Sequence, residues 1–157
     1  MPMLGCAVLA SNVGSSATPR VARGGRELPS IIGTWKLVGA KARDRNGTPL
    51  PTPYGGKGIG RVAFTVDGRM VAVVCDGRPE LPAGTARGYS SYCGNYTFDG
   101  ARLVTRVDAA SDPRRIGGDQ VREVSFDGDH MILRPPPRQT EAGEEYRELT
   151  WARIATE

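Results

Sequence analysis

The side chains able to do chemistry in this 157-residue chain are few and widely spaced. The single histidine, His130, follows a turn at residues 127–129, where we expect it to be exposed to solvent. The three cysteines, Cys6, Cys75 and Cys93, show no C-x-x-C spacing. One His and three scattered Cys cannot build a Cys/His zinc cluster, and a Ser-His-Asp site needs a well-placed His. Both classes of site are therefore excluded, and we expect no cofactor and no metal.

One charged residue, Arg122, stands out by its place in a strand pattern. In the run 120–126 two phases alternate, and Arg122 shares its face with Val124 and Phe126. An interior guanidinium costs several kcal/mol unless it is paired or hydrogen-bonded. Its partner can be internal: a carboxylate such as Asp108 or Glu148, or backbone carbonyl groups. Its partner can instead be the acidic or carbonyl-bearing end of a ligand. Both alternatives stay open at this point.

The elements that would position Arg122 are short strands joined by Asp-Gly turns. Three Asp-Gly pairs each lie between two β-prone runs, and such pairs tolerate the positive φ of a type I′ hairpin turn. The hairpins join 62–66 to 70–75, 92–98 to 103–109, and 120–126 to 131–134. Runs at 35–42 and 146–154 bracket them, which makes eight strands, and no segment shows the apolar periodicity of a helix.

Eight consecutive antiparallel strands would leave exposed edges in an open sheet, and closure removes those edges. We therefore predict an all-β fold, a single eight-stranded antiparallel up-and-down β-barrel, with a sandwich of the same strands as the alternative. The longer connections, at 44–60, 76–91, 110–119 and 135–144, would rim one mouth. Besides the face of Arg122, the apolar faces of the strands comprise Trp35, Leu37, Val62, Phe64, Met70, Ala72, Val74, Tyr92, Tyr96, Phe98, Leu103, Thr105, Val107, Met131, Leu133, Leu149 and Trp151.

Composition and charge limit the partners. The chain is 39% hydrophobic and 24% charged with a net charge of +4, which fits a folded domain with a modest core. No apolar run approaches the roughly 20 residues of a membrane span. The basic residues alternate with acidic ones, as at 41–45, and form no basic stripe with stacking aromatics, so we expect no nucleic-acid partner. The oligomeric state stays open, a homodimer included.

The first 30 residues differ from the rest, being small and polar after a short apolar start. We expect residues 1–30 to be a flexible N-terminal extension and residues 31–157 to form the barrel domain. A secretory signal would require a Lys or Arg before its apolar stretch, and none precedes the stretch 3–10. The scattered cysteines favour a reducing compartment. We expect a cytoplasmic protein, or a periplasmic or secreted one if this segment is a truncated signal peptide.

A series of short motifs runs in a defined order along residues 33–153. They are GTWKLV at 33–38, FTVDGRM at 64–70, GNYTFDG at 94–100, DP at 112–113, QVR at 120–122, DGD at 127–129, LRPP at 133–136 and LTWAR at 149–153. In this order they resemble the lipocalin-like domain family of small bacterial and fungal barrel proteins. The resemblance implies a closed lipocalin or calycin barrel with a hydrophobic cavity. It also implies structural roles for Trp35, which would plug the closed end, and for Arg153, which would pack over the Trp35 ring.

This chain departs from the family at one position of interest. Where the family often carries a His in the strand before the Asp-Pro turn, this chain has Thr105 and Arg106. The base that the resemblance would have offered is therefore missing.

These observations lead to two hypotheses for function. The first is binding, inside the barrel, of a small hydrophobic ligand with a carbonyl, phenol or carboxylate end, which Arg122 and Tyr96 would orient. The expected ligand-binding residues are Phe64, Met70, Tyr92, Phe98, Thr105 and Trp151. The alternative, suggested by the resemblance, is a cofactor-free isomerase or cyclase acting on a polyketide or terpenoid substrate. In that case Arg122 would stabilise developing charge and Tyr96 would act as the acid or hydrogen-bond donor.

Overall fold

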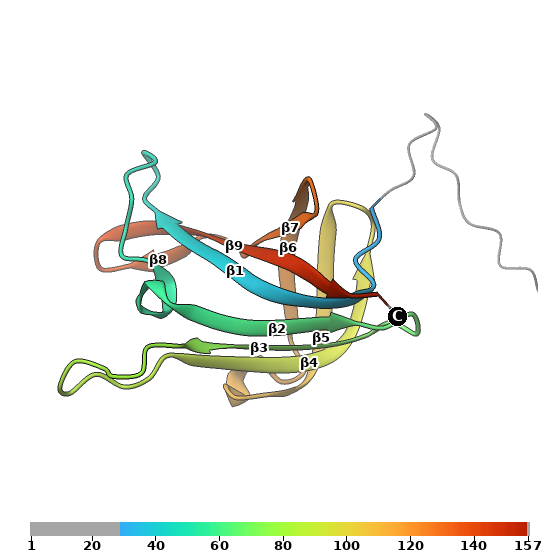
Figure 1. The fold of residues 1–157 in the computed structure, drawn as a ribbon, viewed down its shortest axis with the longest axis horizontal. Coiled ribbons are helices and arrows are strands. Elements are labelled where there is room, and N and C mark those ends of the chain that lie inside the picture. The colour runs from blue at the N-terminus through green and yellow to red at the C-terminus, as the bar shows by residue number, and fades with distance from the viewer. Residues whose placement is uncertain (1–28, 157) are drawn as a thin grey trace, which may run out of the picture.

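The fold consists almost entirely of antiparallel strands, as the computed structural model shows for residues 29–156 (Figure 1). The strands are β1 (Gly33–Arg43), β2 (Gly58–Phe64), β3 (Arg69–Asp76), β4 (Tyr89–Phe98), β5 (Arg102–Ala110), β6 (Asp119–Asp127), β7 (His130–Arg134), β8 (Arg138–Thr140) and β9 (Gly143–Ala155). Two short 3-10 turns, η1 (Pro53–Gly56) and η2 (Pro113–Arg115), lie in the connections. Apart from its last two residues, the predicted extension 1–30 lies outside the described residues.

Eight strands close into a barrel, because β9 pairs with both β7 and β1. This confirms the predicted antiparallel up-and-down barrel and rules out the sandwich. The ninth strand, β8, was not predicted, because the region 135–144 was expected to be a connection. It forms because β9 runs on beyond the end of β7, so that its first residues are available to pair with Arg138–Thr140.

The hairpin turns lie where the Asp-Gly pairs predict them, but they are not of type I′. Gly68, Gly100 and Gly128 have φ values of 83°, 104° and 54°, and neither neighbour of any of them has a positive φ. A type I′ turn needs two successive residues with positive φ. At the β4–β5 turn the carboxylate of Asp99 instead accepts hydrogen bonds from the N–H groups of Ala101 and Arg102, at 2.9 and 2.7 Å.

The inner wall follows the predicted alternation. The buried apolar side chains on it are Trp35, Leu37, Val62, Phe64, Met70, Ala72, Val74, Leu103, Val107, Val124, Met131, Leu133 and Trp151. Two of the irregularities in strand pairing lie between Leu37 and Gly39 and between Cys93 and Gly94. At the second, a Cβ on Gly94 would lie 1.9 Å from the carbonyl oxygen of Arg106, so only glycine fits there.

One end of the barrel is closed by the segment that precedes β1. The indole N–H of Trp35 donates to the carbonyl of Ile31 at 2.8 Å, and the Arg153 guanidinium lies 4.1 Å from the centroid of the Trp35 ring. Arg153 also donates to the carbonyls of Ser30 and Ile32. This is the stacked geometry that the resemblance implied for Trp35 and Arg153.

Candidate functional site

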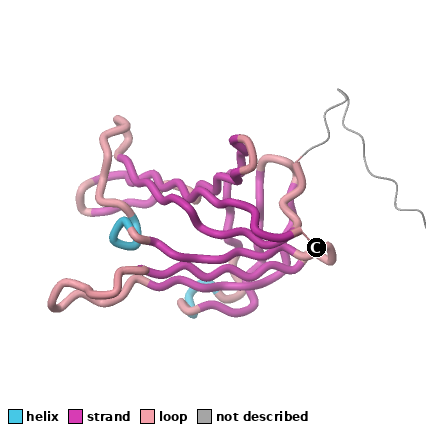
Figure 2. Tube along the Cα trace, viewed as in Figure 1, coloured by secondary structure: helices cyan, strands magenta, loops and turns pink. Residues whose placement is uncertain are grey.

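The opposite end, which we call the mouth, carries the long connections. In an up-and-down barrel every second connection lies at the same end, so the β1–β2, β3–β4, β5–β6 and β7–β9 connections meet there, away from the tight hairpins (Figure 2). Such connections on a rigid barrel are where functional side chains commonly lie.

A buried carboxylate braces the β3–β4 connection at the mouth. Asp76 is 3% exposed and accepts two hydrogen bonds from the Arg78 Nε at 3.0 Å and one from its Nη2 at 2.5 Å. Arg87 donates to the backbone carbonyls of Asp76 and Arg78 at 2.6 and 2.7 Å. The side-chain and backbone hydrogen bonds from Arg78 lower the pKa of Asp76 below its ordinary value. Asp76 is therefore an ionised structural group.

A second buried carboxylate, Glu145, braces the β8–β9 hairpin in the same way. Arg138 and Arg147 each donate to it from Nε at 2.6 Å. Burial raises the pKa of Glu145, but the hydrogen bonds from Arg147 and Arg138 outweigh burial and hold the pKa below its ordinary value. Both buried carboxylates of the mouth are thus ionised at neutral pH, so neither can donate a proton, and the arginine hydrogen bonds weaken each of them as a base.

The side chain of Tyr96 lies near the closed end. Its hydroxyl donates to the carbonyl of Thr65 at 2.9 Å, in the β2–β3 turn, and its ring meets Phe64 edge-on at 5.2 Å between centroids. Phe64 pairs directly with Met70, and Phe98 packs against the core cluster that contains both. Four of the predicted site residues are therefore brought together in an apolar cluster, with the Tyr96 hydroxyl held by the backbone.

Arg122 lies on the inner wall with neither of its predicted carboxylate partners. Its Nη1 donates to the carbonyl of Val121 at 2.6 Å and its Nη2 approaches the side-chain oxygen of Gln120 at 3.4 Å. Asp108 and Glu148 are paired elsewhere, with Arg69 and Arg134, both at 2.8 Å. The internal alternative is thus met in part, through a carbonyl and an amide, and the charge of Arg122 has no counter-charge among the described residues.

Tyr92 lies beside Arg122 and beside a residue that the sequence analysis missed. The Arg122 and Arg115 guanidinium carbons each lie 5.9 Å from the centroid of the Tyr92 ring. Arg115 comes from η2 in the β5–β6 connection and donates to the hydroxyl of Ser90 at 2.9 Å. A signal was present in the sequence, because Asp112 is followed by two arginines and can neutralise only one of them.

Two buried polar atoms on the inner wall have no hydrogen-bond partner among the described residues: the hydroxyl of Thr105 and the indole N–H of Trp151. The two residues are 0% and 2% exposed. Thr105 lies on β5 in register with Tyr96 on one side and Gln120 on the other. Leaving a buried polar group unsatisfied costs about 1–3 kcal/mol, so each such atom in a folded protein calls for an explanation.

A second residue that the sequence analysis missed, Tyr54, lies at the mouth. It is the one described non-glycine residue with a positive φ, at 56°, in the left-handed region that favours glycine. Its side chain packs against the core, and a Cβ on Gly88 would lie 3.4 Å from its ring. Backbone strain of this kind persists where the surroundings impose it and is common at functional sites. The sequence did offer one indication of Tyr54, because it is the one aromatic residue in the glycine-rich stretch 53–60.

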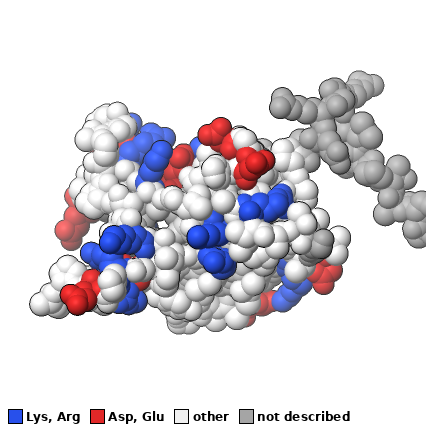
Figure 3. All heavy atoms as spheres, in the orientation of Figure 1, with Lys and Arg blue, Asp and Glu red and all other residues white. Residues whose placement is uncertain are grey.

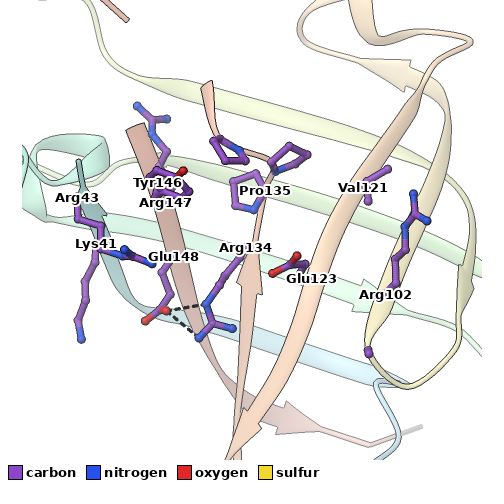
Figure 4. Close-up of a pocket in the computed structure, with 13 residues that line it drawn as sticks. Lys41, Arg43, Arg102, Val121, Glu123, Arg134, Pro135, Tyr146, Arg147 and Glu148 are labelled. Atoms are coloured by element: carbon purple, nitrogen blue, oxygen red, sulfur yellow. Dashed lines mark hydrogen bonds and ion pairs between the residues drawn. The ribbon is translucent and has the colours of Figure 1, made fainter. Parts of the chain in front are cut away.

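A groove on the outer surface of the barrel contains none of the predicted site residues. Its volume is about 880 Å³, and it lies over β1, β9, β7 and β6, with the ion pair of Arg134 and Glu148 inside it (Figure 4). The groove exists because β7 ends at Arg134 and the chain turns away through Pro135–Pro137. Residues 119–122 of β6 therefore have no strand beside them on that side.

The remaining reactive side chains form no site. His130 is exposed at the start of β7, as expected. Burial and a hydrogen bond to Asp108 raise the pKa of the Cys93 thiol, which disfavours the nucleophilic thiolate. The part of the chain that the structure describes holds no cluster of His, Cys, Asp and Glu suited to a metal ion, and no helix in it is long and apolar enough to span a membrane. Basic groups on the face in Figure 3 lie apart, with acidic groups among them.

The lipocalin-like domain family matches residues 32–154. This chain belongs to the lipocalin-like domain family. The match covers all eight strands of the closed barrel, and small antiparallel barrels of this kind can hold one small ligand. No curated protein matches the chain.

Proposed function

We propose that this lipocalin-like barrel binds a small, largely apolar molecule in its interior through a carbonyl, phenol or carboxylate end. The observation that carries the proposal is the pair of unpartnered polar atoms on the inner wall, at Thr105 and Trp151. Both groups donate hydrogen bonds, so the matching group on a ligand is an acceptor oxygen. The apolar wall around them suits an apolar body.

Access to the interior would be from the mouth, where Tyr54, Tyr92 and Leu149 pack against the core. These three side chains are only partly buried, so a ligand would displace them without disturbing the closed end. Binding is preferred over the isomerase or cyclase alternative because the hydroxyl of Tyr96 is already donated to the Thr65 carbonyl.

The proposal is tested with N-phenyl-1-naphthylamine, a neutral fluorophore that brightens in apolar surroundings. We expect saturable binding with energy transfer from Trp151, one of the two tryptophans of the chain. The bound fluorophore should be displaced by 2-naphthol at lower concentrations than by naphthalene, by a few-fold to tenfold, the size of one hydrogen bond. Thr105→Val should narrow that difference.

Two controls locate the site. Trp151→Phe should lower the energy transfer, with the remainder coming from Trp35, which lies two residues from Leu37, the β1 partner of Trp151. Tyr146→Ala, in the outer groove, should leave binding unchanged. Absence of fluorophore binding up to its solubility limit would overturn the proposal. Loss of binding in Tyr146→Ala with retention in Trp151→Phe would place the ligand in the groove and equally overturn an interior site.

A further inference from the structure

Two half-buried arginines differ from the other half-buried arginines of the described chain. Among the others, Arg78, Arg134 and Arg147 each pair with a carboxylate. Arg153 is held by the Trp35 ring and two backbone carbonyls. Arg115 and Arg122 have no carboxylate partner, yet they share the ring of Tyr92. Each guanidinium has five N–H donors, and hydrogen bonds to described residues occupy one donor on Arg115 and two on Arg122. Most of their donors are therefore unused.

The acidic residues nearest to Arg115 in the chain are paired elsewhere. Asp112 forms two hydrogen bonds with the side chain of Arg114, at 2.9 Å each, and caps η2 through the Arg114 N–H. Asp119 approaches Arg106 at 3.4 Å. Arg114 consequently points outward, neutralised and 88% exposed, while Arg115 turns inward to Ser90 and Tyr92. The η2 turn with its cap, residues 112–115, thus has two arginines and one aspartate and a net charge of +1.

The two guanidinium carbons lie at most twice 5.9 Å apart, because both lie 5.9 Å from one ring centroid. Two like charges within this distance repel each other where both are half-buried, and an anion placed with them offsets the repulsion. Planar guanidinium groups match the geometry of a carboxylate, which accepts paired N–H donors. Beside them, Gln120 is in register with Thr105, whose hydroxyl is unpartnered. Donors thus continue from the mouth into the interior.

We propose that Arg115, Arg122 and Tyr92 form a carboxylate site, and that the barrel takes an amphipathic monocarboxylic acid with its acid group at the mouth. This inference rests on the proposed function and narrows its three polar ends to one. Arg115 becomes a specificity-determining residue. The apolar tail of the acid lies along the inner wall toward Thr105 and Trp151.

The experiment compares two molecules that differ only in the head group, decanoate and 1-decanol, as competitors of bound N-phenyl-1-naphthylamine. In the unmodified protein at neutral pH, decanoate should displace the fluorophore at a concentration on the order of tenfold lower than decanol, the size of a charge-assisted hydrogen bond. Arg115→Met and Arg122→Met should each remove most of this preference, and decanol should still displace the fluorophore. Retained decanol affinity also shows that each variant is folded.

Arg114→Met is the matched control, because it removes the same charge from the adjacent, exposed residue. It should keep the preference for decanoate. Equal displacement by acid and alcohol in the unmodified protein overturns the carboxylate site while leaving the proposed function intact. An equal loss in Arg114→Met and Arg115→Met also overturns it, because net charge alone then explains the preference. If the fluorophore does not bind at all, the proposed function itself fails, and this site with it.

Discussion

The unpartnered hydroxyl of Thr105 predicts that a conservative substitution makes the protein more stable. Thr105→Val exchanges the hydroxyl for a methyl group of similar size at a position that is 0% exposed. Because an unsatisfied buried polar group costs about 1–3 kcal/mol, we expect the free energy of unfolding to rise by about 1–2 kcal/mol. For a chain of this length that corresponds to a rise in Tm of about 2–4 °C per kcal/mol.

The control is Thr65, whose hydroxyl donates to Asp67 and accepts from the N–H of Arg69 at 3.1 Å. Thr65→Val should lower the free energy of unfolding by about 0.5–1.5 kcal/mol, so the two substitutions should shift stability in opposite directions. The assay is urea unfolding of the ligand-free proteins, followed by tryptophan fluorescence and circular dichroism. If Thr105→Val destabilises the protein as much as Thr65→Val does, the hydroxyl has a partner in solution and the reasoning about the site is refuted.

Three further predictions concern the mouth and the closed end. Glu145→Gln should lower the free energy of unfolding by about 2 kcal/mol at pH 7, and therefore lower the Tm relative to the unmodified protein. Because the fold lowers the pKa of Glu145 below 4.5, this difference in Tm should be fully present above pH 4.5 and shrink as the pH falls through the folded-state pKa. A pH-independent difference in Tm would contradict this. Tyr54→Gly should relieve left-handed strain and uncover the mouth, so stopped-flow mixing should show faster association of N-phenyl-1-naphthylamine; an unchanged rate would show that the ring does not cover the access route. Arg153→Met should cost about 1–2 kcal/mol in urea unfolding, red-shift the fluorescence of Trp35 and leave fluorophore binding unchanged, whereas reduced binding would extend the site to the closed end.

The inner wall could be predicted from the sequence because side chains of a half-buried strand alternate with period two. That rule was enough to place Arg122 and Thr105 inside, along with the apolar core. It could not say what Arg122 contacts, because cross-barrel neighbours depend on strand stagger and on the paths of the connections. Glu148 and Asp108, the carboxylates proposed as its partners, lie on the outer face with other arginines.

The residues missed in the sequence, Arg115 and Tyr54, both belong to connections. Their positions follow from local turns, η2 with its Asp112 cap and η1 with a left-handed tyrosine, rather than from any periodic pattern. The type of the hairpin turns was missed for a similar reason: an Asp-Gly pair predicts where a chain reverses, whereas loop length and side-chain hydrogen bonds decide how.

The early end of β7 has a consequence for how the barrel can change. A closed barrel protects every strand edge, but residues 119–122 of β6 face Pro135–Pro137, and prolines lack the N–H that a continuing strand would donate. The prolines therefore leave this edge of β6 without a paired strand and offer no template for another strand. Because no β-sheet hydrogen bonds cross this gap, lengthening the β7–β9 connection within residues 135–142 could widen the interior of the barrel and leave the buried side chains in place. This gap is thus where the barrel can make room for a larger ligand.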